Sequence, residues 1–229
     1  MSVDDLFAEL RRHAGWENES GAIDAARRIA ELPGDAPLKR MIAALEAVDR
    51  IDLSEDAGDI GDEVHRLRMA YRAGLVAFGA RAIPLLRPLV TVELREPRHT
   101  VMIRVLAALG DQSITPILAA WSMDLEQERF FVRLAAIEAL GLLRPPEASS
   151  LLRAALTQPG TLNQGWLKRI SAIALGRIGD LEALEVLLDD SDWFARLGVA
   201  EAVKDLSGER VERIRKRLKA DVDPRVRRV

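Results

Sequence analysis

A motif that returns about every 30 residues constrains this chain most. It occurs at 132–141, 167–176 and 195–204, and in each copy a basic residue precedes the predicted turn position by eight. Gly141 and Gly176 occupy that turn position in the first two copies. A unit of this length cannot bury its apolar face alone and must stack on its neighbours. The repeat therefore predicts a rod-like or curved stack of helix pairs.

The composition indicates that the repeated units are helical. Apolar residues make up 48% of the chain, yet aromatic residues make up only 4%, and alanine and leucine dominate. Both are strong helix formers, and small side chains allow helices to pack closely. Because no long stretch alternates with period two, we predict an all-α fold.

Several classes of protein are disfavoured by charge and composition. A net charge of −3 argues against a general nucleic-acid binder, which would normally carry a basic stripe. The absence of cysteine excludes disulfides, thiolate ligands and a cysteine nucleophile. We find neither a signal region nor a long apolar run, so we expect a cytoplasmic protein without a membrane span. The excess of 28 arginines over 5 lysines resembles bacterial coding bias.

The second helix of each pair sets the register of the array. Each is expected to bury one aliphatic side chain deeply, and the longest interval between these positions spans an acidic insertion. This pattern predicts about six antiparallel helix pairs after one N-terminal helix. The six aliphatic positions are Ile42, Leu86, Leu118, Leu152, Leu187 and Ile214.

We predict a single solenoid over residues 1–229 with three parts. Residues 1–50 hold the N-terminal helix and the first pair, 51–63 form an acidic inserted loop, and 64–229 hold stacked pairs that are best formed over 131–219. The chain ends with what reads as the first turn of a further helix. Such an end leaves apolar surface that a partner or a second copy can cover, so self-association through this end is a further hypothesis.

The segments 132–141 and 174–183 resemble the consensus of HEAT-like repeats, in which Val-Arg precedes Ala-Leu-Gly and Ile-Gly-Asp. They are similar to the short HEAT-like repeats of phycobilisome bilin lyases. The resemblance is good over 131–206, looser over 21–130 and absent at 1–20 and 51–63. It implies a right-handed α-solenoid, an armadillo/HEAT-like superhelix, with the second helices lining the concave face. It implies no particular activity, because such repeats serve many roles.

The repeat produces a column of bases at Arg133, Lys168 and Arg196, continued by Arg227. One hypothesis is a ladder that grips acidic groups of a partner. The interpretation we favour is internal: each base pairs with a turn carboxylate such as Asp180, or with free carbonyls of a neighbouring repeat.

An aromatic residue stands two positions before each base, at Phe131, Trp166 and Phe194, with Phe130 and Trp193 beside them. Equivalent positions in stacked repeats align, so the rings are expected to form a ridge along one edge. Exposed rings beside cations suit a protein partner or stacked bases. The alternative, which we favour, is that the rings pack into the turns between repeats.

Two tryptophans, Trp121 and Trp16, do not belong to this column of rings. Trp121 ends a second helix and is expected in the core, whereas Trp16 follows the first helix and is expected to fold back over the N-terminal end. The charges along the second helices alternate in sign, which fits a protein partner or a solvated face. Residues 209–229 are basic and 51–63 are acidic, and one hypothesis is that this asymmetry orients a partner or drives head-to-tail association. The interpretation we favour for the basic segment is an ordinary solvated helix with ion pairs four residues apart.

The histidines are scattered, and neither metal-binding nor nucleotide-binding motifs occur. We therefore expect no metal and no cofactor, and the pattern favours a non-catalytic scaffold that binds another protein through its concave face or its edge. The candidate partner-binding residues are Phe131, Arg133, Trp166, Lys168, Trp193, Phe194 and Arg196. The alternatives are a bilin-lyase-like chromophore attachment or chaperone factor, and a HEAT-like DNA-binding protein or alkylpurine glycosylase.

Overall fold

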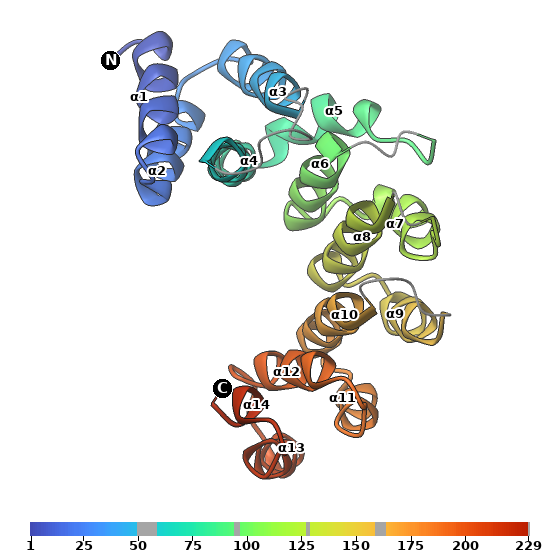
Figure 1. Ribbon diagram of the computed structural model, residues 1–229. Coiled ribbons are helices and arrows are strands. Elements are labelled where there is room, and N and C mark those ends of the chain that lie inside the picture. The colour runs from blue at the N-terminus through green and yellow to red at the C-terminus, as the bar shows by residue number, and fades with distance from the viewer. Residues whose placement is uncertain (50–58, 94–96, 127–128, 159–163, 229) are drawn as a thin grey trace. The chain divides into compact units, whose positions relative to one another are not determined.

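A computed structural model describes residues 1–49, 59–93, 97–126, 129–158 and 164–228. Within these ranges every regular element is a helix (Figure 1), which confirms the predicted all-α class. None of the helices in these ranges is long and apolar enough to span a membrane. The chain forms two compact units, Met1–Asp111 and Gln112–Val229.

The first unit is built around one long helix, α4, which contacts α1, α2, α3 and α6. Leu67, Tyr71 and Leu75 of α4 are buried. Spacings of four residues place these side chains on one stripe of the helix, which is the side that forms the core. The helices of this unit are α1 (Val3–Gly15), α2 (Glu19–Ala30), α3 (Ala36–Asp49), α4 (Asp59–Ala77), α5 (Ile83–Leu86) and α6 (Pro97–Ala108), with short 3-10 turns η1 (Gly79–Ala82) and η2 (Arg87–Leu89).

Helix α1 begins with a reciprocal cap. The Ser2 hydroxyl accepts a hydrogen bond from the Asp5 backbone N–H at 3.1 Å, and the Asp5 carboxylate accepts one from the Ser2 backbone N–H at 2.8 Å. The pair satisfies two donors that a helix start leaves free. After the helix, Trp16 is 73% exposed, so the expectation that it folds back over the N-terminal end is wrong. Its ring lies instead near the Arg12 guanidinium, 5.9 Å from centroid to carbon.

The predicted acidic loop at 51–63 lies largely outside the described residues. The described chain resumes at Asp59, where α4 already begins, so residues 59–63 of the predicted loop are helical. Asp62 and Glu63 are therefore helical.

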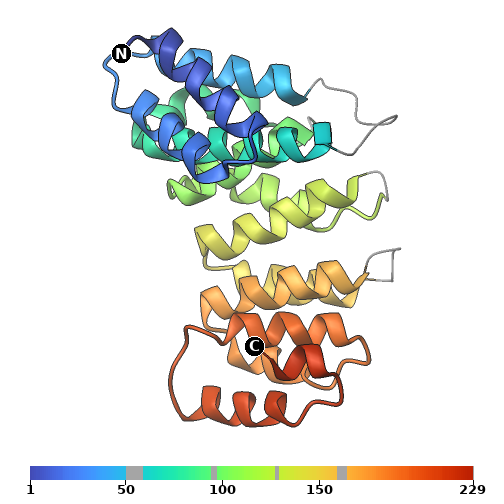
Figure 2. The same cartoon turned by 60° about the vertical axis from the view of Figure 1, so that its left-hand side comes forward.

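The second unit alternates first and second helices (Figures 1 and 2). The first helices α8, α10, α12 and α14 stack in sequence on one side of this unit, and α7, α9, α11 and α13 lie on the other. The bounds are α7 (Thr115–Ser122) after a 3-10 turn η3 (Gln112–Ile114), α8 (Phe130–Leu143), α9 (Ala148–Thr157), α10 (Gln164–Ile178), α11 (Leu181–Leu187), α12 (Trp193–Ala202), α13 (Glu209–Lys219) and α14 (Pro224–Arg227). Helices that pack in neighbouring pairs are the arrangement of an α-solenoid, as predicted.

The register predicted for the second helices is confirmed. All six aliphatic positions, from Ile42 to Ile214, are buried. Trp121 is fully buried, as expected. The structure therefore places the apolar stripe of each second helix where the sequence periodicity placed it.

Two turns between first and second helices repeat the same Gly-Asp geometry. Gly110 and Gly179 have φ of 78° and 79°, a region that favours glycine. The N–H of the aspartate that follows bonds back into the helix, from Asp111 to Leu106 O and from Asp180 to Leu175 O, both at 3.0 Å. The glycine therefore lets the chain turn at the end of the helix, and the aspartate N–H binds one of the last free carbonyls of that helix.

Gly141 and Gly176 are not turn residues, contrary to the sequence interpretation. Both lie inside first helices and are buried. A Cβ at Gly141 would lie 2.7 Å from the Ala174 backbone, and one at Gly176 would lie 2.9 Å from the Ala202 carbonyl oxygen. These glycines let successive first helices approach at backbone distance, a role that a sequence pattern does not separate from that of a turn glycine.

Candidate protein-interaction edge

The column of bases is directed into the second unit. Arg133 is only 3% exposed, and its guanidinium donates to the carbonyls of Ser122 and Ala155, both at 3.0 Å. These carbonyls lie in the last turns of α7 and α9, which lack helical partners for their final carbonyls. Burial lowers the pKa of Arg133. Arg133 therefore ties the ends of two second helices together.

Lys168, Arg196 and Arg227 repeat this role one repeat after another. Lys168 reaches the Asp190 carboxylate at 2.6 Å, after the end of α11. Arg227 donates to the carbonyls of Asp221 and Val222 at 2.6 and 3.1 Å, after the end of α13. The favoured interpretation, in which the bases bind carboxylates and carbonyls of the array itself, describes all four residues.

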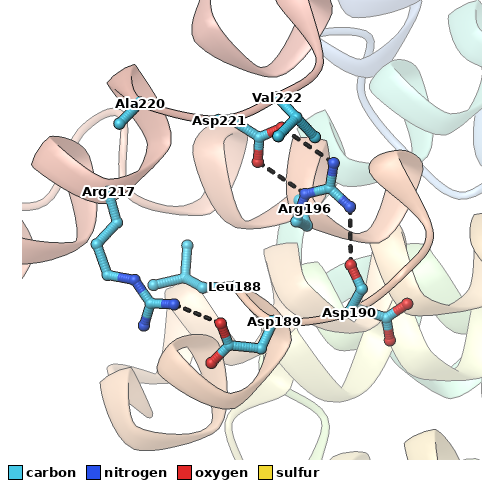
Figure 3. Close-up of a pocket in the computed structure, with 8 residues that line it drawn as sticks. All are labelled: Leu188, Asp189, Asp190, Arg196, Arg217, Ala220, Asp221 and Val222. Atoms are coloured by element: carbon cyan, nitrogen blue, oxygen red, sulfur yellow. Dashed lines mark hydrogen bonds and ion pairs between the residues drawn. The ribbon is translucent and has the colours of Figure 1, made fainter.

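Arg196 carries the most complete of these ties (Figure 3). Its guanidinium binds both oxygens of Asp221 at 2.7 and 2.9 Å and donates to the Asp190 carbonyl at 2.7 Å. The Arg196 hydrogen bonds lower the pKa of Asp221, and Asp221 raises that of Arg196. The surrounding pocket of about 260 Å³ also holds an Arg217–Asp189 pair, at 2.5 Å. Both guanidinium groups that line this pocket, those of Arg196 and Arg217, therefore already bind acceptors within the chain.

The second helices present a face whose charges are paired between repeats. Arg153 of α9 forks onto Asp180 at 2.8 and 2.6 Å, and Ser149 donates to the same carboxylate at 2.6 Å. Arg210 of α13 forks onto Glu185 of α11 at 3.0 and 2.6 Å. Asp180 is thus matched by Arg153 and not by the base column, which corrects the partner suggested from the sequence. These contacts lower the Asp180 pKa to about 2.

The predicted aromatic residues gather at the starts of successive first helices. We call this set the aromatic edge: Phe130 and Phe131 of α8, Trp166 of α10, and Trp193 and Phe194 of α12. Phe194 packs edge-on against both tryptophans, with ring centroids 5.0 Å apart in each pair. Phe130 and Phe131 form a separate edge-on pair at 5.6 Å.

The aromatic edge is partly packed and partly open. Phe131 is 74% exposed and Trp166 is 48% exposed, whereas Phe130, Trp193 and Phe194 are of intermediate exposure. The three rings of α10 and α12 therefore brace one another between repeats, as the packing alternative predicted. Phe131 and Trp166 still present large apolar surface to solvent.

Two arginines that the sequence analysis did not select complete the edge. The Arg169 guanidinium lies 5.5 Å from the Trp166 ring centroid and 4.8 Å from that of Phe194. Arg169 also forks onto Glu201 of α12 at 2.8 and 2.5 Å. Arg225 lies 3.3 Å from the Trp193 ring centroid and is paired with Asp223. Both contacts are within cation–π range.

Each arginine had a signal in the sequence. Arg169 lies three residues after Trp166, so the two side chains share a face of α10. Arg225 lies two residues before the base Arg227, the position that an aromatic residue fills in the earlier repeats. The register of the repeat therefore places Arg225 on the aromatic edge.

The paired helices and the repeated ties define an α-solenoid repeat protein. Residues 132–158, which contain most of α8 and all of α9, match the family model described as the PBS lyase HEAT-like repeat. This match supports a HEAT-like repeat protein, as the resemblance indicated. No curated protein matches the sequence.

Proposed function

We propose that this protein is a non-catalytic scaffold that binds another protein through the aromatic edge. The observation that carries the proposal is the exposure of Phe131 and Trp166, at 74% and 48%, beside arginines that are already held in place. Aromatic side chains, tryptophan above all, and arginine side chains dominate the energetics of protein interfaces. Burying one such ring against a partner contributes about 1.5–3 kcal/mol.

The charges support a protein partner over a nucleic acid. The two cations on the edge, Arg169 and Arg225, are matched by Glu201 and Asp223. A phosphate backbone requires uncompensated cations, and binding to it weakens steeply with salt. We therefore expect the partner to present apolar or aromatic groups to the rings.

The competing surface is the face of the second helices. Many of its charges are engaged between repeats, as at Arg153–Asp180 and Arg210–Glu185. A partner that bound these charges would have to break the existing ion pairs and desolvate the charged groups, and the new ion pairs would only replace the old ones. Binding through the aromatic edge is therefore favoured over binding through the concave face.

A photo-crosslinking residue tests the proposal in the source cell. In one variant the crosslinking residue replaces Phe131 on the edge. In the control variant it replaces Val186, a residue of α11 that is 70% exposed and lies on the second-helix side. We expect a defined crosslinked protein from position 131 only, and we expect Trp166→Ala to reduce that product about tenfold or more.

Crosslinking from position 186 alone would move the interface to the second helices and reject the edge. Equal crosslinking by the Trp166→Ala protein would show that the rings do not bind the partner. Urea unfolding of each variant establishes that the protein is folded, which matters most for Trp166→Ala because Trp166 also packs against Phe194.

The matched repeat is described as that of a PBS lyase, which supports one second candidate, a bilin-lyase-like factor. Its test is spectroscopic: a bilin added to the purified protein shifts its absorbance if the chain holds the tetrapyrrole. A spectrum identical to that of free bilin removes this candidate.

A further inference from the structure

A second surface of the unit Gln112–Val229 differs chemically from the aromatic edge. It is a hollow of about 260 Å³ between the end of α12, the last turns of α13, and α14. Four of its lining residues are apolar and four are cationic, and none is acidic or aromatic. The lining residues are Ala200, Val203, Lys204, Arg215, Leu218, Lys219, Val226 and Arg227.

The two lysines of this hollow are exposed and hold no carboxylate within ion-pair distance in the described part of the chain. The two arginines are fixed by the fold. Arg215 donates to the carbonyls of Val203, Lys204 and Leu206 at 2.8–2.9 Å, and Arg227 donates to carbonyls after α13. Arg215 also pairs with Glu212 at 2.5 Å, so the two arginines form a rigid wall whose charge is partly compensated, while the lysines remain able to pair with an incoming anion.

The floor of the hollow is aliphatic. Val203, Leu218 and Val226 are 2%, 5% and 1% exposed, so they are buried in the unit and present only a small apolar surface at the base of the hollow. Lysine stems extend such a base while their ammonium groups stay in water. An aliphatic side chain gains from contact with this base, whereas a nucleobase finds no ring on which to stack.

We propose that this hollow docks an acidic, leucine-rich amphipathic segment of a partner protein. Aliphatic side chains of the segment lie on the floor formed by Val203, Leu218 and Val226. Carboxylates on its flanks pair with Lys204 and Lys219. The docking surface is separate from the aromatic edge, so either can fail in experiment without the other.

Fluorescence anisotropy with the full chain tests the proposal. The probe is a labelled synthetic peptide with glutamates and leucines at helical spacing, titrated at about 0.15 M salt so that diffuse attraction is screened. We expect saturable binding that weakens about tenfold in the double variant Lys204→Glu/Lys219→Glu. Lys216→Glu, which changes the same charge on α13 outside the hollow, is expected to leave binding within about twofold.

Two further probes separate the aliphatic contribution and other ligands. Replacing the peptide leucines by serines is expected to weaken binding about tenfold, since apolar burial is lost. No saturable binding, equal loss in Lys216→Glu, or equal binding of the serine peptide would overturn the proposal. Tighter binding of a duplex DNA oligonucleotide through the same lysines would assign the hollow to nucleic acid. Sedimentation that shows a dimer abolished by the double variant would assign it to a second copy of the chain.

Discussion

Single residues in this protein act by closing the ends of helices. Asp180 shows the pattern most fully, because it caps α11 through the Ala183 N–H at 3.1 Å and also accepts from Arg153 and Ser149 of the preceding repeat. One carboxylate thus joins a turn, a helix start and the neighbouring second helix. Its side chain is only 9% exposed, which protects these contacts from solvent screening.

The stabilising effect of Asp180 is expected to depend on pH. Its pKa is lowered from 3.8 to about 2 in the folded protein. A lowered pKa stabilises the fold above the unfolded value, and this contribution is lost as the pH falls from about 4 towards 2. We expect Asp180→Asn to lower the free energy of unfolding at pH 7, and its deficit to shrink by about 2 kcal/mol at low pH.

Urea unfolding of both proteins across this range measures the difference. A deficit that stays constant from neutral to acid pH would show that the Asp180 contacts are not electrostatic. Ser150→Ala, which removes an exposed hydroxyl on the same helix as Arg153, provides a variant whose effect is expected to be independent of pH.

At the scale of elements, the stacking of first helices depends on glycines within them. In an ordinary helix, glycine to alanine stabilises by about 0.5–1 kcal/mol. At Gly176 the added Cβ would lie 2.8 Å from the Ala202 Cβ and 2.9 Å from its carbonyl oxygen. We therefore expect Gly176→Ala to destabilise by about 1–3 kcal/mol, the cost of overpacking.

Gly61→Ala in α4 is the matched substitution, because nothing lies within 4 Å of the new Cβ. It is expected to leave stability unchanged or raise it. Thermal or urea unfolding of the two variants compares them directly. Shifts in the same direction would mean that helix propensity, and not the contact with α12, decides both.

The sequence predicted the buried side of each second helix better than it predicted the contacts between neighbouring repeats. Apolar periodicity was sufficient to assign the buried stripe of every second helix, from Ile42 to Ile214, because that stripe is a local property. The role of Gly176 and the partner of Asp180 depend on how neighbouring repeats approach one another, which no spacing within one repeat encodes. The exposure of Trp16 is of the same kind, since nothing local to it determines what covers it.

The candidate site was predicted in part for the same reason. The alignment of rings at Phe131, Trp166 and Phe194 follows from the repeat period, and the structure brings Trp166 and Phe194 into contact. The bases chosen with them point inward, whereas Arg169 and Arg225 lie against the rings. Lys168 and Arg169 are neighbours in the sequence, but their side chains leave α10 in different directions. The repeat pattern alone does not predict which of the two faces the rings.

At the scale of the whole molecule, contacts run mainly between neighbouring repeats. Residues 112–229 form a compact unit with its own buried core, which includes Leu152 and Leu187. We expect this fragment to fold by itself, with a helical circular dichroism spectrum and a cooperative urea transition. An unstructured spectrum would contradict the expectation.

A fragment that ends at residue 205 serves as its comparison. It keeps α12 but lacks α13, so Val203 loses its cover and Arg196 loses Asp221. We expect this shorter fragment to unfold at lower urea than the fragment 112–229. Equal midpoints would mean that the final second helix adds no stability to the array.

The ties made by the base column bear on how such a chain can lengthen or shorten during evolution. Arg196 links the carbonyl that follows α11 to the carboxylate that follows α13, so one tie draws on two successive repeats. Duplication of a whole helix pair copies the guanidinium together with its acceptors. A breakpoint inside a pair would leave a buried cation facing no acceptor, which strongly destabilises a fold. The tie therefore favours gain and loss of complete helix pairs over smaller insertions.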